Sequence, residues 1–381
     1  MLRKILTFFQ KETVLSISAI LAILSMFIVH PSDKYFSYID FRTLSLLFCL
    51  MSIVAGLSEI GLFDYLAEKI LSRANSIKSI IVLLVLLCFF FSMIITNDVA
   101  LITFVPFAII ILKKMSEKQK NYWILRTVVM QTIAANLGSM LTPIGNPQNL
   151  YLYARANMSA LALIRLMLPY SIAALVLLLV WIQIAAHREP GSTTENHISE
   201  LFSIHKAKAP NQTSLIGYLI LFLICLLVVA HIIDYKISFI LVIGYIFFKN
   251  WHLFKKVDYS LLLTFTALFI FIGNLKCIPQ FNHFLISIID GHETLTAILS
   301  SQIISNVPAA ILLSGFTKNY SALIIGTNIG GLGTLIASMA SLISFKYIAK
   351  EKTTLRGKYF MMFTIANIVF LILLLLCINL L

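Results

Sequence analysis

Long apolar segments recur along most of the chain, separated by short polar stretches. Membrane-spanning helices need roughly 20 mostly apolar residues, so a repeated pattern of this kind predicts an all-α polytopic membrane protein with about 11 spans. The segments include Val14–Val29, Thr43–Leu57, Ile80–Ile95, Ser171–Ala186, Leu215–Ala230, Ile237–Phe248, Leu261–Ile272 and Phe360–Ile378.

Two pairs of apolar segments are joined by only two or three polar residues. Basic residues flank the first pair on both outer sides, at Lys78 and at Lys113–Lys120, so both of its ends belong on one face of the membrane. We expect a re-entrant hairpin that enters from the cytoplasm, and a second one that enters from the opposite face. The pairs are Ile77–Ile95 with Val99–Leu112, around Thr96-Asn97-Asp98, and Leu295–Ile304 with Val307–Phe316, around Ser305-Asn306.

Two further spans are interrupted by residues that do not continue a lipid-facing helix. Gln131–Asn149 divides the span from Trp123 to Tyr153 and contains two prolines, two glycines and three asparagines. Thr327–Thr334 divides the span from Ser321 to Phe345 in the same way. Non-helical backbone at membrane depth is tolerated only where protein or a watery cavity covers it, so we expect two broken helices that line a site.

The two breaks align without gaps at an offset of 192 residues. This offset pairs Asn136 with Asn328, Gly138 with Gly330, Thr142 with Thr334, Ile144 with Ile336 and Leu150 with Leu342. Each half then runs span, hairpin and broken helix, and opposite hairpin entry makes the repeat inverted. We expect an N-terminal half at residues 1–186, a polar cytoplasmic linker at 187–212 and a C-terminal half at 213–381.

The composition agrees with a membrane protein, since 60% of the residues are hydrophobic and 12% are charged. The net charge of +13 comes from basic residues spread through short loops, so the positive-inside rule explains it better than a nucleic-acid partner does. We expect a multi-pass protein of the plasma or bacterial inner membrane, with a cytoplasmic N-terminus and the C-terminus outside.

Half-helices that end inside a membrane provide a binding site with few charged side chains. Their positive N-terminal ends attract anions, while unwound carbonyls and C-terminal ends coordinate cations. We therefore expect one anion site, with transported sodium near Asn97 and Asn306 and no structural metal. The expected binding residues are Thr96, Asn97, Asp98, Asn136, Thr142, Gly145, Asn146, Pro147, Asn149, Ser305, Asn306, Thr327, Asn328, Gly330 and Thr334.

Asp98 is the only acidic residue in the two hairpin tips and the two breaks. A carboxylate at membrane depth is costly unless it is protonated, paired or beside a cation, so Asp98 is the leading candidate for ion coupling. An alternative is that Asp98 caps the half-helix Val99–Leu112. The two roles are compatible.

The sequence offers nothing that points to catalysis. It has no Ser/His/Asp set, H-E-x-x-H motif or metal cluster in a span, no channel filter such as T-V-G-Y-G, and no nucleotide-binding P-loop. We expect a secondary active transporter rather than an enzyme, a channel or an ATP-driven pump. Its expected partners are a small anion, a coupling cation and the lipid bilayer, and no cofactor is needed.

The sequence resembles the ion transporter superfamily that includes citrate-transporter-like permeases, divalent anion/sodium symporters, arsenite-efflux permeases and a group of sodium/proton antiporters. The T-x-I-G-x-P-x-N broken helix of that superfamily is similar to LTPIGNPQNLYLY, residues Leu141–Tyr153, and its two hairpin tips are similar to TNDVALITFVP and SNVPAAILL. The resemblance implies an elevator-type movement of hairpins and broken helices against a dimeric scaffold.

Two functions follow from the resemblance. The first is transport of di- or tricarboxylates, citrate-like anions included, coupled to sodium or protons. The second is arsenite-type efflux or sodium/proton antiport that uses Asp98. Dicarboxylate symporters carry Ser-Asn-Thr at both tips, whereas this chain has Thr-Asn-Asp and Ser-Asn-Val-Pro.

The expected topology can be tested with a cysteine at Lys118, in a basic loop after the first hairpin. We expect an impermeant thiol reagent to modify this cysteine from the cytoplasmic side only, because the positive-inside rule keeps that loop in the cytoplasm. Modification from the outside alone would contradict the inverted repeat.

Overall fold

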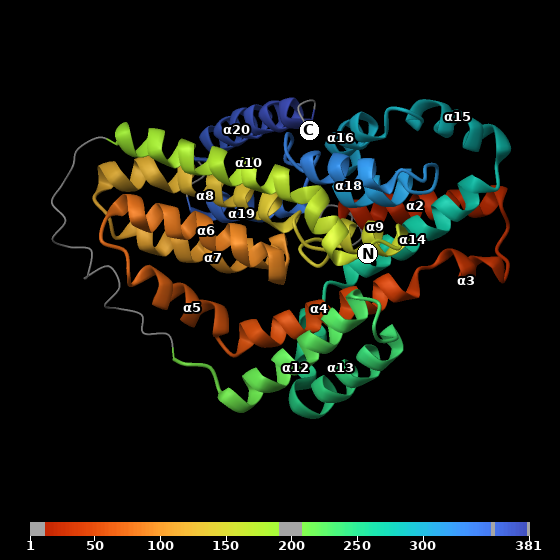
Figure 1. Cartoon of the computed structure of the whole chain (residues 1–381), viewed down its shortest axis with the longest axis horizontal. Helices are drawn as coiled ribbons and strands as arrows, with labels where there is room; N and C mark the ends of the chain where they lie inside the picture. Colours follow the sequence, from red (N-terminus) through yellow and green to blue (C-terminus); the bar gives the residue numbers. More distant parts are fainter. Residues whose placement is uncertain (1–11, 190–207, 352–354, 379–381) are drawn as a thin grey trace, which may run out of the picture.

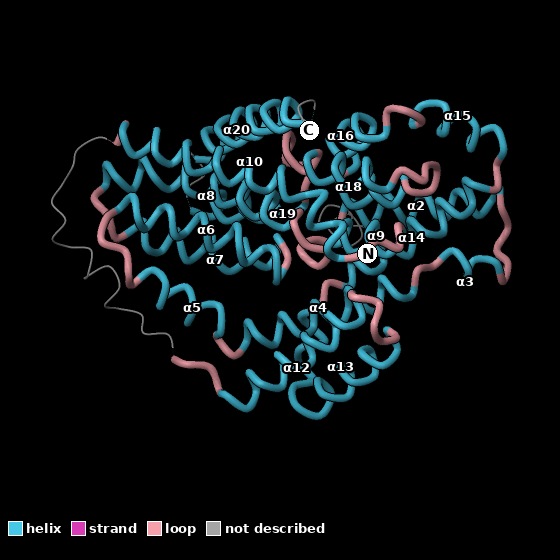
Figure 2. The backbone as a smooth tube through the Cα atoms, in the orientation of Figure 1, coloured by secondary structure: helices cyan, strands magenta, loops and turns pink. Residues whose placement is uncertain are grey.

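The computed structural model describes residues 12–189, 208–351 and 355–378. Within these ranges the chain is helical and contains no strand (Figure 2). Seven of the described helices are long and apolar enough to cross a bilayer, and Thr13–Ile28 and Tyr320–Ile329 are shorter apolar helices. The expected apolar segments fall in helices to within a residue, which confirms an all-α polytopic membrane protein.

The helices of the first half begin before the first hairpin and end at the linker. They are α2 (Thr13–Ile28), α3 (Lys34–Tyr38), α4 (Phe41–Glu59), α5 (Leu62–Leu71), α6 (Ile77–Ile95), α7 (Asn97–Lys113), α8 (Glu117–Ser139), α9 (Pro147–Arg155) and α10 (Ala160–His187). Most of the expected linker, residues 190–207, lies outside the described part of the chain.

The helices of the second half follow in a similar order. They are α12 (Gln212–Val229), α13 (Tyr235–Asn250), the 3₁₀ helix η2 (Trp251–Lys256), α14 (Tyr259–Lys276), α15 (Pro279–Ile289), α16 (Glu293–Ile304), α17 (Asn306–Leu313), α18 (Tyr320–Ile329), α19 (Met339–Glu351) and α20 (Leu355–Ile378).

One group of helices, which we call the framework, consists of α2, α3, α4, α12, α13 and α14. Within it, α14 packs against α2, and α12 and α13 pack against α4, which lies with them along the lower edge of Figure 1. The helices α4 and α14 begin alike: Asp40 has φ −84° and ψ 85°, Asp258 has φ −78° and ψ 83°, and each carboxylate accepts a first-turn N–H. Such a cap contributes about 1 kcal/mol to a helix.

The second group, which we call the hairpin bundle, consists of α6–α10 and α16–α20. Its two hairpins are α6 with α7 and α16 with α17, and they pack against α8 and α18 respectively. The helix α8 lies at the centre of this group, since its residues from Trp123 to Ser139 are buried apart from Arg126. The central helix therefore carries the first break into the interior of the protein.

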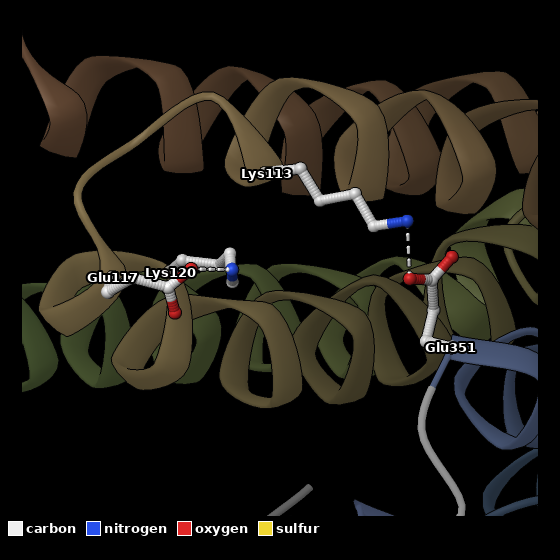
Figure 3. Close-up of polar contacts among 4 residues, drawn as sticks. All are labelled: Lys113, Glu117, Lys120 and Glu351. Carbon is white, nitrogen blue, oxygen red and sulfur yellow. Dashed lines mark hydrogen bonds and ion pairs between the residues drawn. The ribbon is translucent and has the colours of Figure 1, made fainter.

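The hairpins also pack across the two halves of the sequence. The returning arm α7 contacts α19, and the returning arm α17 contacts α9. An ion pair between Lys113 at the end of α7 and Glu351 at the end of α19 reinforces the first of these contacts (Figure 3). The two halves of the chain therefore interdigitate in the hairpin bundle.

The outer helices expose large apolar side chains. Phe27 on α2 is 75% exposed, Phe248 on α13 is 88% exposed and Ile303 on α16 is 76% exposed. Apolar surface on this scale is unfavourable in water and matches the hydrocarbon of a bilayer. The lipid-facing surface therefore surrounds a core in which polar residues are buried.

Candidate functional site

The backbone has the same unusual conformation at both hairpin tips. Thr96, between α6 and α7, has φ 74° and ψ 152°, and Ser305, between α16 and α17, has φ 72° and ψ 153°. Residues other than glycine essentially avoid positive φ with extended ψ, at a cost of about 1–3 kcal/mol each. Equal strain at both tips indicates that the surroundings hold each turn in place.

The first residue of each returning helix ties its tip to a break. The N–H of Asn97 donates to the carbonyl of Gly145 at 3.1 Å, and the N–H of Asn306 donates to the carbonyl of Ala337 at 2.9 Å. Gly145 and Ala337 are a pair at the 192-residue offset that aligns the breaks. The two tips are therefore anchored at equivalent positions, inside the protein, and both asparagines are 5% exposed.

A second bond joins the arriving helix of each hairpin to the same break. The hydroxyl of Thr142 donates to the carbonyl of Met93 at 2.5 Å, and that of Thr334 donates to the carbonyl of Gln302 at 3.1 Å. Thr142 and Thr334 are again a pair at that offset. Each hairpin is thus attached to its break by the same two contacts.

The two breaks are joined to each other by a reciprocal set of side-chain bonds. The amide of Asn136, on α8, accepts from the hydroxyl of Ser338 at 3.0 Å and donates to the hydroxyl of Ser341 at 3.3 Å. The same amide also accepts from Asn97 Nδ2 at 3.2 Å, which connects the first hairpin tip to both breaks. All of these side chains are buried.

The counterpart of Asn136 makes the counterpart bonds. Asn328, on α18, accepts from Asn146 Nδ2 at 3.0 Å and donates through its own Nδ2 to Asn149 Oδ1. Asn146 and Asn149 precede Ser338 and Ser341 by the same 192 residues. Each half therefore uses one helical asparagine to bind the start of the short helix of the other half.

The loop of each break is held by a different side chain. In the first break, Asn149 Nδ2 donates to the carbonyls of Met140 at 3.0 Å and Thr142 at 3.2 Å. In the second, Gln302 Nε2 donates to the carbonyls of Gly330 and Leu332, each at 2.9 Å. Met140 and Leu332 are equivalent positions, so the same carbonyl is satisfied from α9 in one half and from the hairpin arm α16 in the other.

The limits of both breaks differ from those that the sequence predicts. The helix α8 continues to Ser139 and α18 continues to Ile329, so the non-helical segments are 140–146 and 330–338 rather than Gln131–Asn149 and Thr327–Thr334. Gly138 lies inside α8, where a Cβ would come within 2.0 Å of the Phe89 carbonyl oxygen. Its role is close packing of α6 on α8, and glycine at that position does not end the helix.

Several predicted site residues have local structural partners. The hydroxyl of Thr327 donates to the Leu323 carbonyl at 2.7 Å within its own helix. Pro147 is the first residue of α9, where its missing N–H is harmless, and Asn146 caps that helix by accepting from the Asn149 N–H at 2.9 Å. These two residues position α9 at the site.

Asp98 does not cap the returning helix. The helix α7 begins at Asn97, its N-cap residue is Thr96, and no side-chain cap hydrogen bond is present. The Asn97 Oδ1 accepts from the Asp98 N–H at 2.9 Å. The Asp98 carboxylate lies in the first turn, where the helix dipole favours negative charge, and within the described residues no hydrogen bond or ion pair engages it. It therefore remains available to a cation.

Sequence reasoning missed Ser338, Ser341 and Gln302. The first two could have been found from the offset, since they correspond to Asn146 and Asn149. Gln302 corresponds to Met93 through the hairpin contacts, and no sequence similarity links those two residues. Its position depends on how α16 packs, which a single sequence does not reveal.

The arrangement brings both C-terminal and N-terminal helix ends to one region. The helices α8 and α18 end at the breaks, where their C-terminal ends are negative. The short helices α9 and α19 and the returning arms α7 and α17 all begin beside the breaks, and their N-terminal ends are positive. No three His, Cys, Asp or Glu side chains lie together in the described part of the chain, so a cation here would bind mainly carbonyl and amide oxygens. The site is suited to anions and to hard monovalent cations.

Replacing Gly145 by alanine tests the anchoring of the first tip. Its Cβ would lie 2.1 Å from the Ser139 carbonyl oxygen, so the loop must shift and weaken the bond between Gly145 and Asn97. We expect a loss of about 1–3 kcal/mol of stability, measured as a lower thermal unfolding temperature in detergent.

Gly244→Ala on α13 is the matched control, because no atom lies within 4 Å of its Cβ position. Equal unfolding temperatures for Gly145→Ala and Gly244→Ala would contradict this account of the anchor.

Known proteins are similar to this chain over most of its length. The sequence profile of the citrate transporter family matches residues 5–320. An uncharacterized transporter of Methanocaldococcus jannaschii is 34% identical over 332 residues, which cover 87% of each chain. The inner membrane protein YbiR of Escherichia coli is 32% identical over 85% of this chain and 84% of its own length. A 46 kDa membrane protein of Mycobacterium leprae is 22% identical over 90% of this chain and 87% of its own.

The profile covers most of the chain, and two relatives exceed 30% identity over most of their length. These matches establish a membrane transporter, not an enzyme. The chain belongs to the citrate transporter family.

Proposed function

We propose that this protein is a secondary active transporter of di- or tricarboxylates, driven by a sodium or proton gradient. The observation that carries the proposal is the set of bonds that joins the two breaks to each other through Asn136 and Asn328 and each hairpin tip to a break through Asn97 and Asn306. It gathers four helix N-terminal ends and many neutral amides in one buried region. The family name and the transporter relatives support the same function.

The anion site of this proposal lies between the two breaks. Thr142, Asn146 and Thr334 line it, and the N-terminal ends of α9 and α19 supply positive potential. No Lys or Arg occurs in the segments 140–146 and 330–338, so helix ends and amides carry the attraction. A site without a fixed positive charge binds an anion weakly until a cation arrives, which is the basis of coupling.

The cation sites of this proposal lie beside the tips. Carbonyls near Gly145 and Gly330, together with the side chains of Asn97 and Asn306, provide the oxygen ligands that sodium prefers. Each carbonyl has two lone pairs, so the Gly145 oxygen can accept from Asn97 and still bind a cation. The remaining predicted residues, Thr96 and Ser305, hold the strained turns.

The movement follows from the same contacts. We infer an inverted repeat with two re-entrant hairpins, because the tips bond to equivalent positions of the breaks and not to surface loops. The hairpin bundle then moves as an elevator against the framework, and a second copy packs on the framework to form a homodimer. The N-terminus is cytoplasmic and the C-terminus outside, in a cell membrane such as the bacterial inner membrane.

The second candidate function is sodium/proton antiport or arsenite-type efflux. The observation that favours it is the Asp98 carboxylate, which has no partner among the described residues and lies next to the tip. An exchanger of this kind would carry one cation at a time on Asp98. The two functions differ in whether a carboxylate is accumulated.

The proposal is tested with purified protein in proteoliposomes. We expect a sodium or a proton gradient, applied separately, to drive accumulation of labelled citrate or succinate. Ion exchange without accumulation of any carboxylate would overturn the proposal in favour of antiport.

In the same assay, Asn97→Ala and Asn306→Ala should each raise the cation concentration for half-maximal uptake by about tenfold, because each removes a ligand to a charged species. Asn282→Ala on α15, away from tips and breaks, is the matched control. Unchanged cation dependence in both tip variants would leave these asparagines with a packing role only.

Asp98→Asn tests ion coupling. The change removes the charge but keeps the size of the side chain, and the bond from the backbone N–H of residue 98 to the Asn97 Oδ1 is retained. We expect a folded protein with an unchanged elution profile whose uptake loses most of its dependence on the cation gradient. Full gradient-driven accumulation by this variant would assign coupling to the neutral asparagines.

A further inference from the structure

A cavity of about 240 Å³ lies between the framework and the hairpin bundle, outside the set of bonds that joins the breaks. It is bordered by α3, α4 and α14 on one side and by α9 and α17 on the other. Its polar lining includes Asp40, Tyr151, Arg155, Lys276 and Cys277. Since a water occupies about 30 Å³ of liquid, the cavity has room for roughly eight waters or one small metabolite.

The cavity carries two cations that the protein does not neutralise. Arg155 ends α9 and Lys276 ends α14, and the two side chains are close enough for their charges to act on each other. Within the described ranges, neither side chain forms an ion pair or donates a hydrogen bond to the protein. Gly315 leaves room for Lys276, whose Cε lies 3.1 Å from the position a Cβ would take there.

The one carboxylate that lines the cavity is already engaged. Asp40 accepts from the Thr43 N–H at 3.0 Å and from the Thr43 hydroxyl at 2.7 Å, as the cap of α4. The carbonyl ends of α9 and α14 attract the two cations without cancelling their charge. Two cations and one capped carboxylate leave the cavity net positive.

We propose that this cavity is a second binding site, separate from the one between the breaks, for a small soluble oxyanion that carries carboxylates. The guanidinium of Arg155 presents a planar fork that matches a carboxylate, and the ammonium of Lys276 supplies a second charge. The hydroxyl of Tyr151, which pairs with Ser314 at 2.8 Å, lies on the same wall.

The short helix α9 connects the two sites. Asn149, in its first turn, binds Asn328 at the breaks, and Arg155 ends the helix six residues later, about 9 Å along the axis. The cavity therefore captures the anion near the site that transports it. This last step rests on the proposed function, whereas the binding itself does not.

Cys277 provides a direct reporter, because it is exposed and lines the cavity while Cys49, Cys88 and Cys225 are buried. In full-length protein with Cys377→Ser, we would measure how fast an anionic and a cationic methanethiosulfonate modify Cys277. The rate for the anionic reagent divided by the rate for the cationic reagent does not depend on the intrinsic reactivity of the thiol, so this ratio reports the local electrostatic potential.

We expect Lys276→Gln and Arg155→Gln each to lower this ratio by roughly fivefold, since each removes one nearby charge. Lys276→Arg keeps the charge and should keep the ratio, and Lys236→Gln on α13 is the control for a surface charge elsewhere. A ratio that both neutralising variants leave unchanged would overturn the proposal.

The ligand is tested by protection of Cys277 in phospholipid-free detergent micelles. We expect citrate and succinate to slow modification, glycerol to have no effect, and both neutralising variants to abolish protection. Protection in nanodiscs that contain phosphatidylglycerol, without protection by citrate in micelles, would assign the cavity to a lipid headgroup and overturn the proposal. The assay needs no transport, so a negative result would not affect the proposed function. Likewise, failure of carboxylate uptake would not affect the proposal that the cavity binds an anion.

Discussion

The structure depends on hydrogen bonds that satisfy two stretches of non-helical backbone in the interior of a membrane protein. Hydrocarbon offers no partner to a free polar group, and burying one without a partner costs about 2–7 kcal/mol. Asn149 and Gln302 meet this requirement, because each side-chain amide donates to two carbonyls of a break. Asn136 and Asn328 then join the two breaks through side-chain bonds, because an amide both donates and accepts. The breaks therefore stabilise each other, and with them the strained turns at Thr96 and Ser305 that rest on their carbonyls.

Much of this arrangement could be predicted from the sequence. The apolar segments predicted the long helices, and the 192-residue offset predicted which positions of the breaks correspond. The structure adds that the carbonyls of one such pair, Gly145 and Ala337, anchor the tips. The limits of the breaks were wrong because glycine does not end a helix where a neighbour packs closely, as at Gly138.

Other features depend on tertiary packing and leave no local pattern in the sequence. Met93 and Gln302 occupy equivalent positions, because each carbonyl accepts from the threonine of its own break. Their side chains are chemically different, so the sequence does not reveal this equivalence. The cavity is formed where the ends of α9 and α14, far apart in the sequence, lie close together. The sequence identified Asp98 as an unusual charge, but only the structure shows that no side chain caps α7.

The different bracing of the two loops makes the halves mechanically unequal. In the first half, the loop is fastened by Asn149 to its own short helix α9, so the hairpin is attached to it through the contacts of Asn97 and Thr142. In the second half, Gln302 belongs to the hairpin itself and also fastens the loop, so hairpin and loop form one rigid unit. We therefore expect local opening to begin at the first hairpin, which can separate from its break while the second half stays closed.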